Sequence, residues 1–134
     1  MEGKIAASGN IQTLLKADGS RTDAPAYCYT YMFQNCRSLT TAPELPATTL
    51  ADSCYNYMFS LCESLTTAPV LPATILADSC YSGMFSNCTS LTSAPELPAT
   101  TLASDCYNGM FQGCSSLTTA PSILPATTLA DNCY

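Results

Sequence analysis

The chain of 134 residues has no histidine, no tryptophan and only four basic residues, and these shortages exclude several functions. The four are Lys4, Lys16, Arg21 and Arg37, and residues 38–134 contain no cation. Proteins that bind nucleic acids or anionic membrane surfaces use rows of lysine and arginine. With a formal net charge of −6, the chain is predicted to bind no nucleic acid and no anionic membrane.

Long apolar runs are missing as well. No run approaches the roughly 20 residues that a membrane-spanning helix needs, so no membrane insertion is predicted. The first residues, MEGKIAASGNIQ, lack the basic and then apolar layout of a secretory signal. A signal peptide removed ahead of this chain would leave the same sequence, so these residues do not decide the cellular compartment.

Catalysis has few residues to draw on. Without histidine the chain lacks the commonest general base, and it has no glycine-rich phosphate-binding loop. Its carboxylates recur singly, and no serine or cysteine stands beside an evident base. We therefore predict that the chain is not an enzyme and uses no cofactor.

Repetition is the dominant feature of the sequence. The pair Cys-Tyr recurs at residues 28, 54, 80, 106 and 133, at intervals of 26 or 27. In the first four copies Met-Phe follows, then a second cysteine, then Ser-Leu and a run close to APELPATTLA. Such a period predicts a solenoid, in which each coil packs only on its neighbours. We expect about four 26-residue coils over residues 28–134, after an N-terminal cap and degenerate first coil over residues 1–27.

Local rules divide each coil into two parts. The pair Asp52-Ser53 is typical of a helix N-cap, and Cys54, Met58 and Cys62 then follow at the spacing of one helical face. A helix of about two turns is therefore predicted over residues 54–62. The following SLTTAP is partly β-branched until a proline removes a backbone donor, which predicts a short strand. The expected fold class is an α/β solenoid with a short parallel strand and a short helix in each coil.

The order of residues within a coil resembles the BspA-type leucine-rich repeats of bacterial surface proteins. Those repeats look like SLTSI.LP..LTSIG..AF.GC; here Met-Phe stands for Ala-Phe, while Phe-x-x-Cys, Ser-Leu-Thr and Leu-Pro keep their order. The matching letters include Leu39, Leu45-Pro46, Met58-Phe59, Cys62 and Ser64-Leu65. The resemblance covers about residues 24–134. It implies a right-handed, curved solenoid at the cell surface or outside the cell, used for binding and attachment.

The nine cysteines allow several interpretations. A zinc site usually brings close pairs of ligands together, whereas the cysteines of one coil are eight residues apart, so no metal site is predicted. On one helix Cys54 and Cys62 would lie about 12 Å apart, too far for a disulfide. Equivalent cysteines of neighbouring coils would be about 5 Å apart, which permits a bridge. Buried free thiols are the favoured interpretation, and inter-coil disulfides remain the alternative.

Positions that differ between copies indicate the surface that a partner would contact. Residues shared by all copies are needed for stacking, so the variable ones are expected to face solvent. Tyrosine and arginine are enriched in binding hot spots. The candidate binding face comprises Tyr31, Tyr57, Arg37, Glu63, Glu44 and Glu96.

Two functions are consistent with these features. The first is a non-enzymatic binding module of a bacterial cell-surface protein, which adheres to a host protein or glycan. The alternative is a structural or assembly element, such as a spacer or phage fibre component, acting through end-to-end or lateral packing. The sequence ends at Cys133-Tyr134 without a polar capping repeat. We therefore expect a fragment of a longer array, or self-association through this end.

Overall fold

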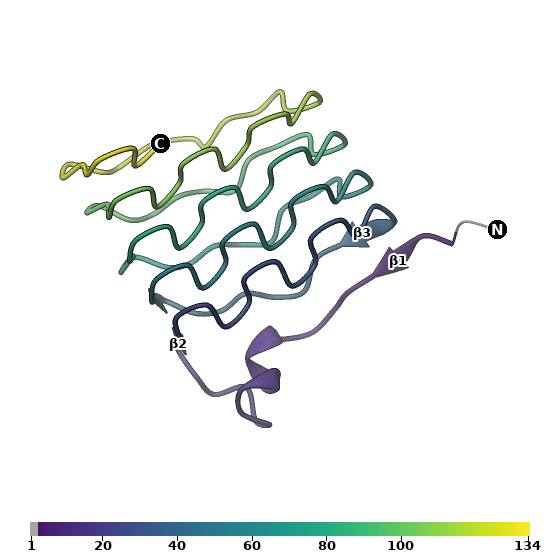
Figure 1. Cartoon of the computed structure of the whole chain (residues 1–134), viewed down its shortest axis with the longest axis horizontal. Coiled ribbons are helices and arrows are strands. Elements are labelled where there is room, and N and C mark those ends of the chain that lie inside the picture. Colours follow the sequence, from purple (N-terminus) through teal and green to yellow (C-terminus); the bar gives the residue numbers. More distant parts are fainter. Residues whose placement is uncertain (1–2) are drawn as a thin grey trace.

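Segments that are 26 residues apart in the sequence lie side by side in the computed structural model, which describes residues 3–134 (Figure 1). The elements are β1 (Ile5–Ala6), the 3-10 helix η1 (Ile11–Leu14), β2 (Asp23–Ala24), β3 (Leu39–Thr41) and β4 (Thr49–Leu50). β1 pairs in parallel with β3, and β2 with β4, forming two small parallel sheets. The described residues contain no α-helix. None of their helical segments has the length and apolar character that crossing a membrane requires.

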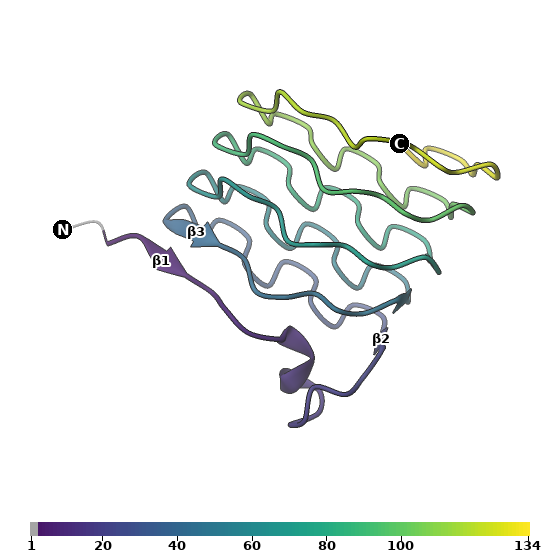
Figure 2. The ribbon, with the colours of Figure 1, turned by 180° about the vertical axis from the view of Figure 1, so that it is seen from behind.

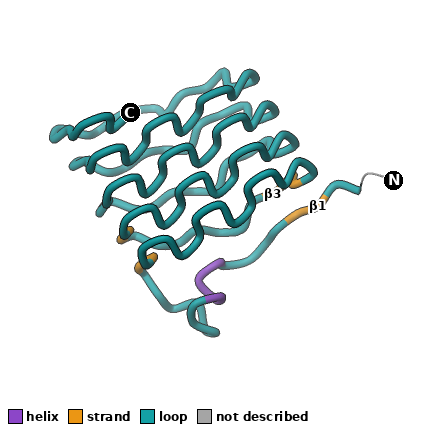
Figure 3. Tube along the Cα trace, viewed as in Figure 1, coloured by secondary structure: helices purple, strands orange, loops and turns teal. Residues whose placement is uncertain are grey.

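The helices expected in each repeat, such as that over residues 54–62, are absent, and this prediction was wrong. Consecutive turns, drawn as loops in Figure 3, occupy residues 26–35, 52–61, 78–87 and 104–113. We call these four segments the turn ribbons. Every fourth residue of a ribbon has a positive φ, as Ser53, Tyr57 and Leu61 do (53°, 50° and 62°). A left-handed residue cannot continue an α-helix, so Ser53 is a turn residue rather than the expected N-cap.

Hydrogen bonds between neighbouring ribbons alternate with hydrogen bonds inside each ribbon. The N–H of Tyr55 donates to Cys80 O over 3.0 Å, and that of Tyr57 donates to Ser82 O over 2.9 Å. The N–H of Met58, in contrast, donates within the ribbon to Tyr55 O over 3.2 Å. The ribbon thus satisfies its backbone donors without the bonds from residue i to i−4 that define a helix.

Two rows of stacked aromatic rings form the centre of the molecule. Ring centroids in the first row are 5.5 to 5.8 Å apart, and its members are Tyr29, Tyr55, Tyr81, Tyr107 and Tyr134. Centroids in the second are 5.5 to 5.9 Å apart, and its members are Phe33, Phe59, Phe85 and Phe111. Met58 and Met84 are fully buried in the same core. Most of the apolar residues that recur from repeat to repeat therefore lie in the core, as their repetition predicts, although Met32 is 43% exposed and Leu129 is 64% exposed.

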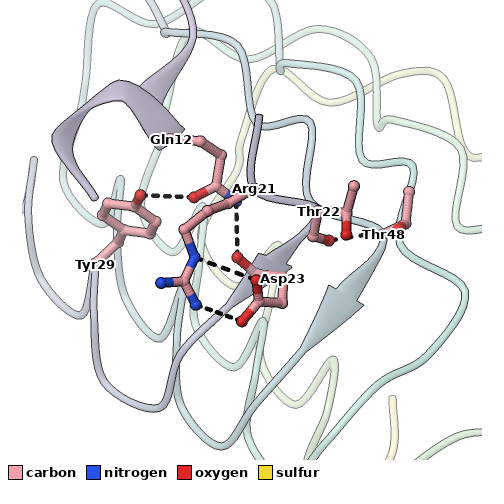
Figure 4. Close-up of polar contacts among 6 residues, drawn as sticks. All are labelled: Gln12, Arg21, Thr22, Asp23, Tyr29 and Thr48. Atoms are coloured by element: carbon pink, nitrogen blue, oxygen red, sulfur yellow. Dashed lines mark hydrogen bonds and ion pairs between the residues drawn. The ribbon is translucent and has the colours of Figure 1, made fainter. Parts of the chain in front are cut away.

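The N-terminal segment closes one side of this core. Gln12, on η1, is fully buried; it accepts a hydrogen bond from Tyr29 Oη (3.0 Å) and donates one to Asp23 O (3.1 Å), as Figure 4 shows. These contacts are those expected of a cap over residues 1–27, although residues 1 and 2 lie outside the described part. The boundary at residue 27 stays a prediction.

The extended segments between ribbons pair less than predicted. Strands longer than one residue occur only in the N-terminal segment and the first repeat, as β1 to β4. Later repeats make single parallel bridges, such as Ser93 with Thr119 and Thr101 with Thr128. Prolines such as Pro69 and Pro72 remove donors from the middle of each segment, so a continuous ladder cannot form there.

Candidate functional site

The six candidate residues lie on different parts of the surface. Tyr31 and Tyr57 belong to the turn ribbons, while Glu44 and Glu96 belong to the extended segments. The view in Figure 2 has the extended segments in front and the ribbons behind, so these two groups occupy opposite sides of the molecule. They therefore cannot form the single binding face that the sequence suggested.

Tyr31 and Tyr57 form an aromatic pair outside the core, which we call the tyrosine pair. Their ring centroids are 5.8 Å apart and the ring planes differ by 23°. Tyr31 is 52% exposed, whereas Tyr57 is half-buried. The reason is that the Tyr57 ring covers Gly83, where an added Cβ would overlap the ring. The tyrosine pair is therefore a surface of two stacked rings that ends at Gly83, which has no side chain to continue the stack.

The backbone explains why these side chains lie along the row of ribbons. Tyr31, Tyr57, Gly83 and Gly109 occupy the same left-handed position of successive ribbons, with φ of 59°, 50°, 59° and 59°. Glycine is the residue that adopts this conformation without steric cost. The glycines at residues 83 and 109 thus indicated a left-handed position in the sequence. The prediction of a helix did not take them into account.

Alanine substitutions at the two equivalent glycines are expected to differ in effect. Both variants carry the left-handed penalty of about 1–2 kcal/mol, but only Gly83→Ala also displaces the Tyr57 ring. At Gly109 the nearest atom to a new Cβ is Gln112 Oε1 at 3.7 Å, an ordinary contact. Urea denaturation should therefore show Gly83→Ala to be the less stable variant. Adding Tyr57→Ala to both should remove the difference, and a difference that persists would contradict the overlap.

Arg37 is engaged within the chain. Its Nη1 lies 3.3 Å from Glu63 Oε1, and its Nε donates to Asn35 Oδ1 over 2.9 Å. Arg37 is 62% exposed in its side chain, so this ion pair contributes little to stability. A partner would meet a neutralised pair at Arg37 and Glu63 rather than a free cation.

Glu44 and Glu96 lie at shallow hollows between proline-rich segments. Glu44 lines a hollow of about 330 Å³ together with Val70. Glu96 lines the next, of about 270 Å³, and its carboxylate accepts hydrogen bonds from Ser122 N over 3.0 and 3.2 Å. Neither carboxylate forms an ion pair with any described residue. The two glutamates were predicted from the sequence as surface positions, but the hollows lined by the prolines around them were not. The repeated APELP, with prolines on both sides of the glutamate, could have indicated these hollows.

The cysteines are placed for packing rather than for reaction. All nine are free thiols in the structure, and Cys62, Cys80 and Cys88 are fully buried. Cys62 and Cys88 each donate to a phenylalanine carbonyl over 3.1 Å. Burial raises the pKa of Cys62, Cys80 and Cys88 to about 12, so these thiols stay protonated near neutral pH.

The side chains that could bind a metal ion are spread over residues 3–134. No group of three or more cysteine, aspartate or glutamate side chains in this range converges in a way that could hold a metal ion. No protein-family model, curated protein or solved structure matches this chain.

Proposed function

We propose that the chain is a non-enzymatic binding module of a bacterial cell-surface protein, built as a right-handed leucine-rich repeat solenoid of the BspA type. Two observations support the solenoid: backbone hydrogen bonds and ring stacks both recur between segments 26 residues apart. The order of Phe-x-x-Cys, Ser-Leu-Thr and Leu-Pro in each repeat supports the family. A cell-surface location follows from that resemblance.

The tyrosine pair is the observation that carries the binding role. Exposed aromatic rings combine a large apolar surface with a polar hydroxyl, and for this reason tyrosine is enriched at interfaces. Most aromatic side chains in the ribbons are buried in the two core rows, yet Tyr31 and Tyr57 stack outside them. The proposed partner is a host protein or glycan that packs on the tyrosine pair.

The experiment is a binding screen of the full chain against host matrix proteins and glycans, repeated with Tyr31→Ala/Tyr57→Ala. Hot-spot residues contribute 2 kcal/mol or more, so the double variant should lose about 30-fold or more in affinity for any partner found. Tyr27→Ala is the matched control, because Tyr27 is 68% exposed, has a positive φ of 57° and lies outside the pair. Equal losses in both variants, or none in the double variant, would count against the tyrosine pair.

One observation favours the alternative, an assembly element. The ribbon 104–113 is paired with residues 131–133 over its first part only, through Tyr107 N to Cys133 O and Asp105 N to Asp131 O. Within residues 3–134 the N–H groups of Gly109 and Phe111 on this edge have no backbone acceptor, and such an edge favours pairing with another ribbon. Light scattering of the same samples separates the two functions: a mass that rises with concentration supports assembly, and a constant monomer mass supports the binding module.

A further inference from the structure

The hollows between the extended segments form one continuous groove. Neighbouring hollows share residues: Val70 and Pro72 line both the first and the second, and Glu96 and Pro98 line both the second and a third of about 380 Å³. We call this surface the proline groove. It is apolar, since Val70 is 80% exposed and Ile123, in the third hollow, is 66% exposed. Its residues belong to the extended segments, which Figure 2 shows on the side of the molecule opposite the turn ribbons.

The backbone of the groove is unpaired where the prolines interrupt the ladder. Within residues 3–134, neither the N–H nor the C=O of Val70 takes part in a hydrogen bond, although neighbouring segments bond through Thr74 and Thr92. Val70 itself is 80% exposed. A peptide that crosses the repeats passes over this residue, and its own backbone groups can hydrogen-bond to the N–H and C=O of Val70.

The charges of the groove specify what kind of peptide fits. Glu44 and Glu96 occupy equivalent positions two repeats apart, and Val70 occupies that position in the repeat between them. Neither glutamate has a cation partner among residues 3–134, and residues 38–134 contain no lysine or arginine. A partner that complements these two charges therefore carries cations of its own.

The spacing of the repeats fixes the spacing of those charges. Neighbouring repeats are separated by 5.5 to 5.9 Å, as measured between stacked rings. An extended or polyproline chain advances about 3.1 to 3.4 Å per residue. Two cations that are three or four residues apart on such a chain therefore match two carboxylates that are two repeats apart.

We propose that the proline groove binds an extended peptide of another protein, in which two lysines or arginines three or four positions apart flank an apolar residue. The apolar side chain packs on Val70 and the prolines, and the two cations meet Glu44 and Glu96. A second copy of this chain does not supply the peptide. Its closest basic residues, Lys16 and Arg21, are five positions apart, and they pair with Asp18 and Asp23.

The test is a nuclear magnetic resonance titration of the full chain with the peptide Lys-Pro-Val-Pro-Lys. Binding should shift the amide resonance of Val70, and Glu44→Gln/Glu96→Gln should weaken the affinity at least tenfold at low salt. Glu63→Gln is the matched control, because Glu63 pairs with Arg37 outside the groove and should leave the affinity unchanged. Because Glu44 and Glu96 are exposed, the double glutamine variant should fold as the wild type does. Unchanged amide resonances away from the groove would show that it has folded.

Two results would overturn the proposal. One is equal affinity of the wild type and the double glutamine variant for the peptide. The other is equal affinity of the wild type for Pro-Lys-Lys-Val-Pro, in which the cations are adjacent, because that would show attraction to net charge alone. The proposal does not rest on the tyrosine pair, and Tyr31→Ala/Tyr57→Ala should bind the peptide as the wild type does. The peptide site and the proposed function of the tyrosine pair are therefore tested separately.

Discussion

Replacing Tyr81 with alanine is expected to lower the free energy of unfolding by about 3–5 kcal/mol, the usual cost of deleting a buried aromatic ring. The Tyr81 side chain is 1% exposed, and its ring lies 5.7 Å from the rings of both Tyr55 and Tyr107. Its loss leaves a cavity in the middle of the row and separates the two halves of the core. Because domains of this size have only about 5–15 kcal/mol of stability in total, the variant should be close to unfolding at room temperature.

Urea denaturation followed by circular dichroism measures this effect. Tyr27→Ala is the matched control, since Tyr27 is 68% exposed and its ring belongs to neither core row. Substitution there should change stability by about 0.5 kcal/mol or less. Similar stability of the two variants would show that the central row of rings does not hold the repeats together.

Raising the pH above about 9 is expected to destabilise the chain progressively until it unfolds. Cys62, Cys80 and Cys88 have an ordinary pKa of 9.0, and burial in the fold raises it to about 12. Burial also raises the pKa of the Tyr55 and Tyr81 hydroxyls far above their ordinary value of 10.0. In all these groups the unfolded chain loses its proton first, so alkali favours unfolding.

The sign and size of the effect follow from the three thiols. Their stabilisation is fully present below pH 9 and is lost as the pH rises from 9 towards 12. Each fully buried thiol removes about 1.4 kcal/mol per pH unit in that window, or about 4 kcal/mol per unit for the three together. Against a total stability of about 5–15 kcal/mol, unfolding is therefore expected between about pH 10 and 12.

An alkaline titration followed by backbone circular dichroism and thiolate absorbance checks this prediction. The loss of structure and the appearance of thiolate from the six buried cysteines should coincide in one cooperative transition. Thiolate from more than the three partly exposed cysteines, formed around pH 9 while the backbone signal stays native, would contradict burial of the cysteine rows.

The repeat and its core could be predicted from the sequence, because every member of the core rows recurs at the same interval. Cys54, Met58 and Phe59 were expected in the interior, and all three are fully buried. The spacing of these residues also fitted a helix, and here the prediction failed. The turn ribbon has its own four-residue period, which the pairs Gly83-Asn87 and Gly109-Gly113 indicated, since glycine and asparagine adopt positive φ more readily than other residues.

The candidate surface was predictable only in part. Comparing the copies found Tyr31 and Tyr57 as variable positions, but only the left-handed backbone shows why Tyr31 stacks on Tyr57 and the Tyr57 ring covers Gly83. The same comparison grouped Glu44 with the tyrosines, because the sequence does not state which variable positions share a side. The proline groove was missed for another reason: residues that persist in every copy were assigned to the core, whereas these prolines line the outside.

The most direct test of this account is a count of free thiols in the native and in the denatured chain, without reductant. It asks whether the repeated cysteines pack in the core, so that binding takes place at other, surface residues. We predict nine thiols after denaturation and prompt reaction in the native state only of the partly exposed Cys28, Cys36 and Cys114. A count of about one after denaturation would show that the cysteines are bridged. Prompt native reaction of all nine would show that they are accessible for chemistry, and either result would contradict the buried rows of free thiols.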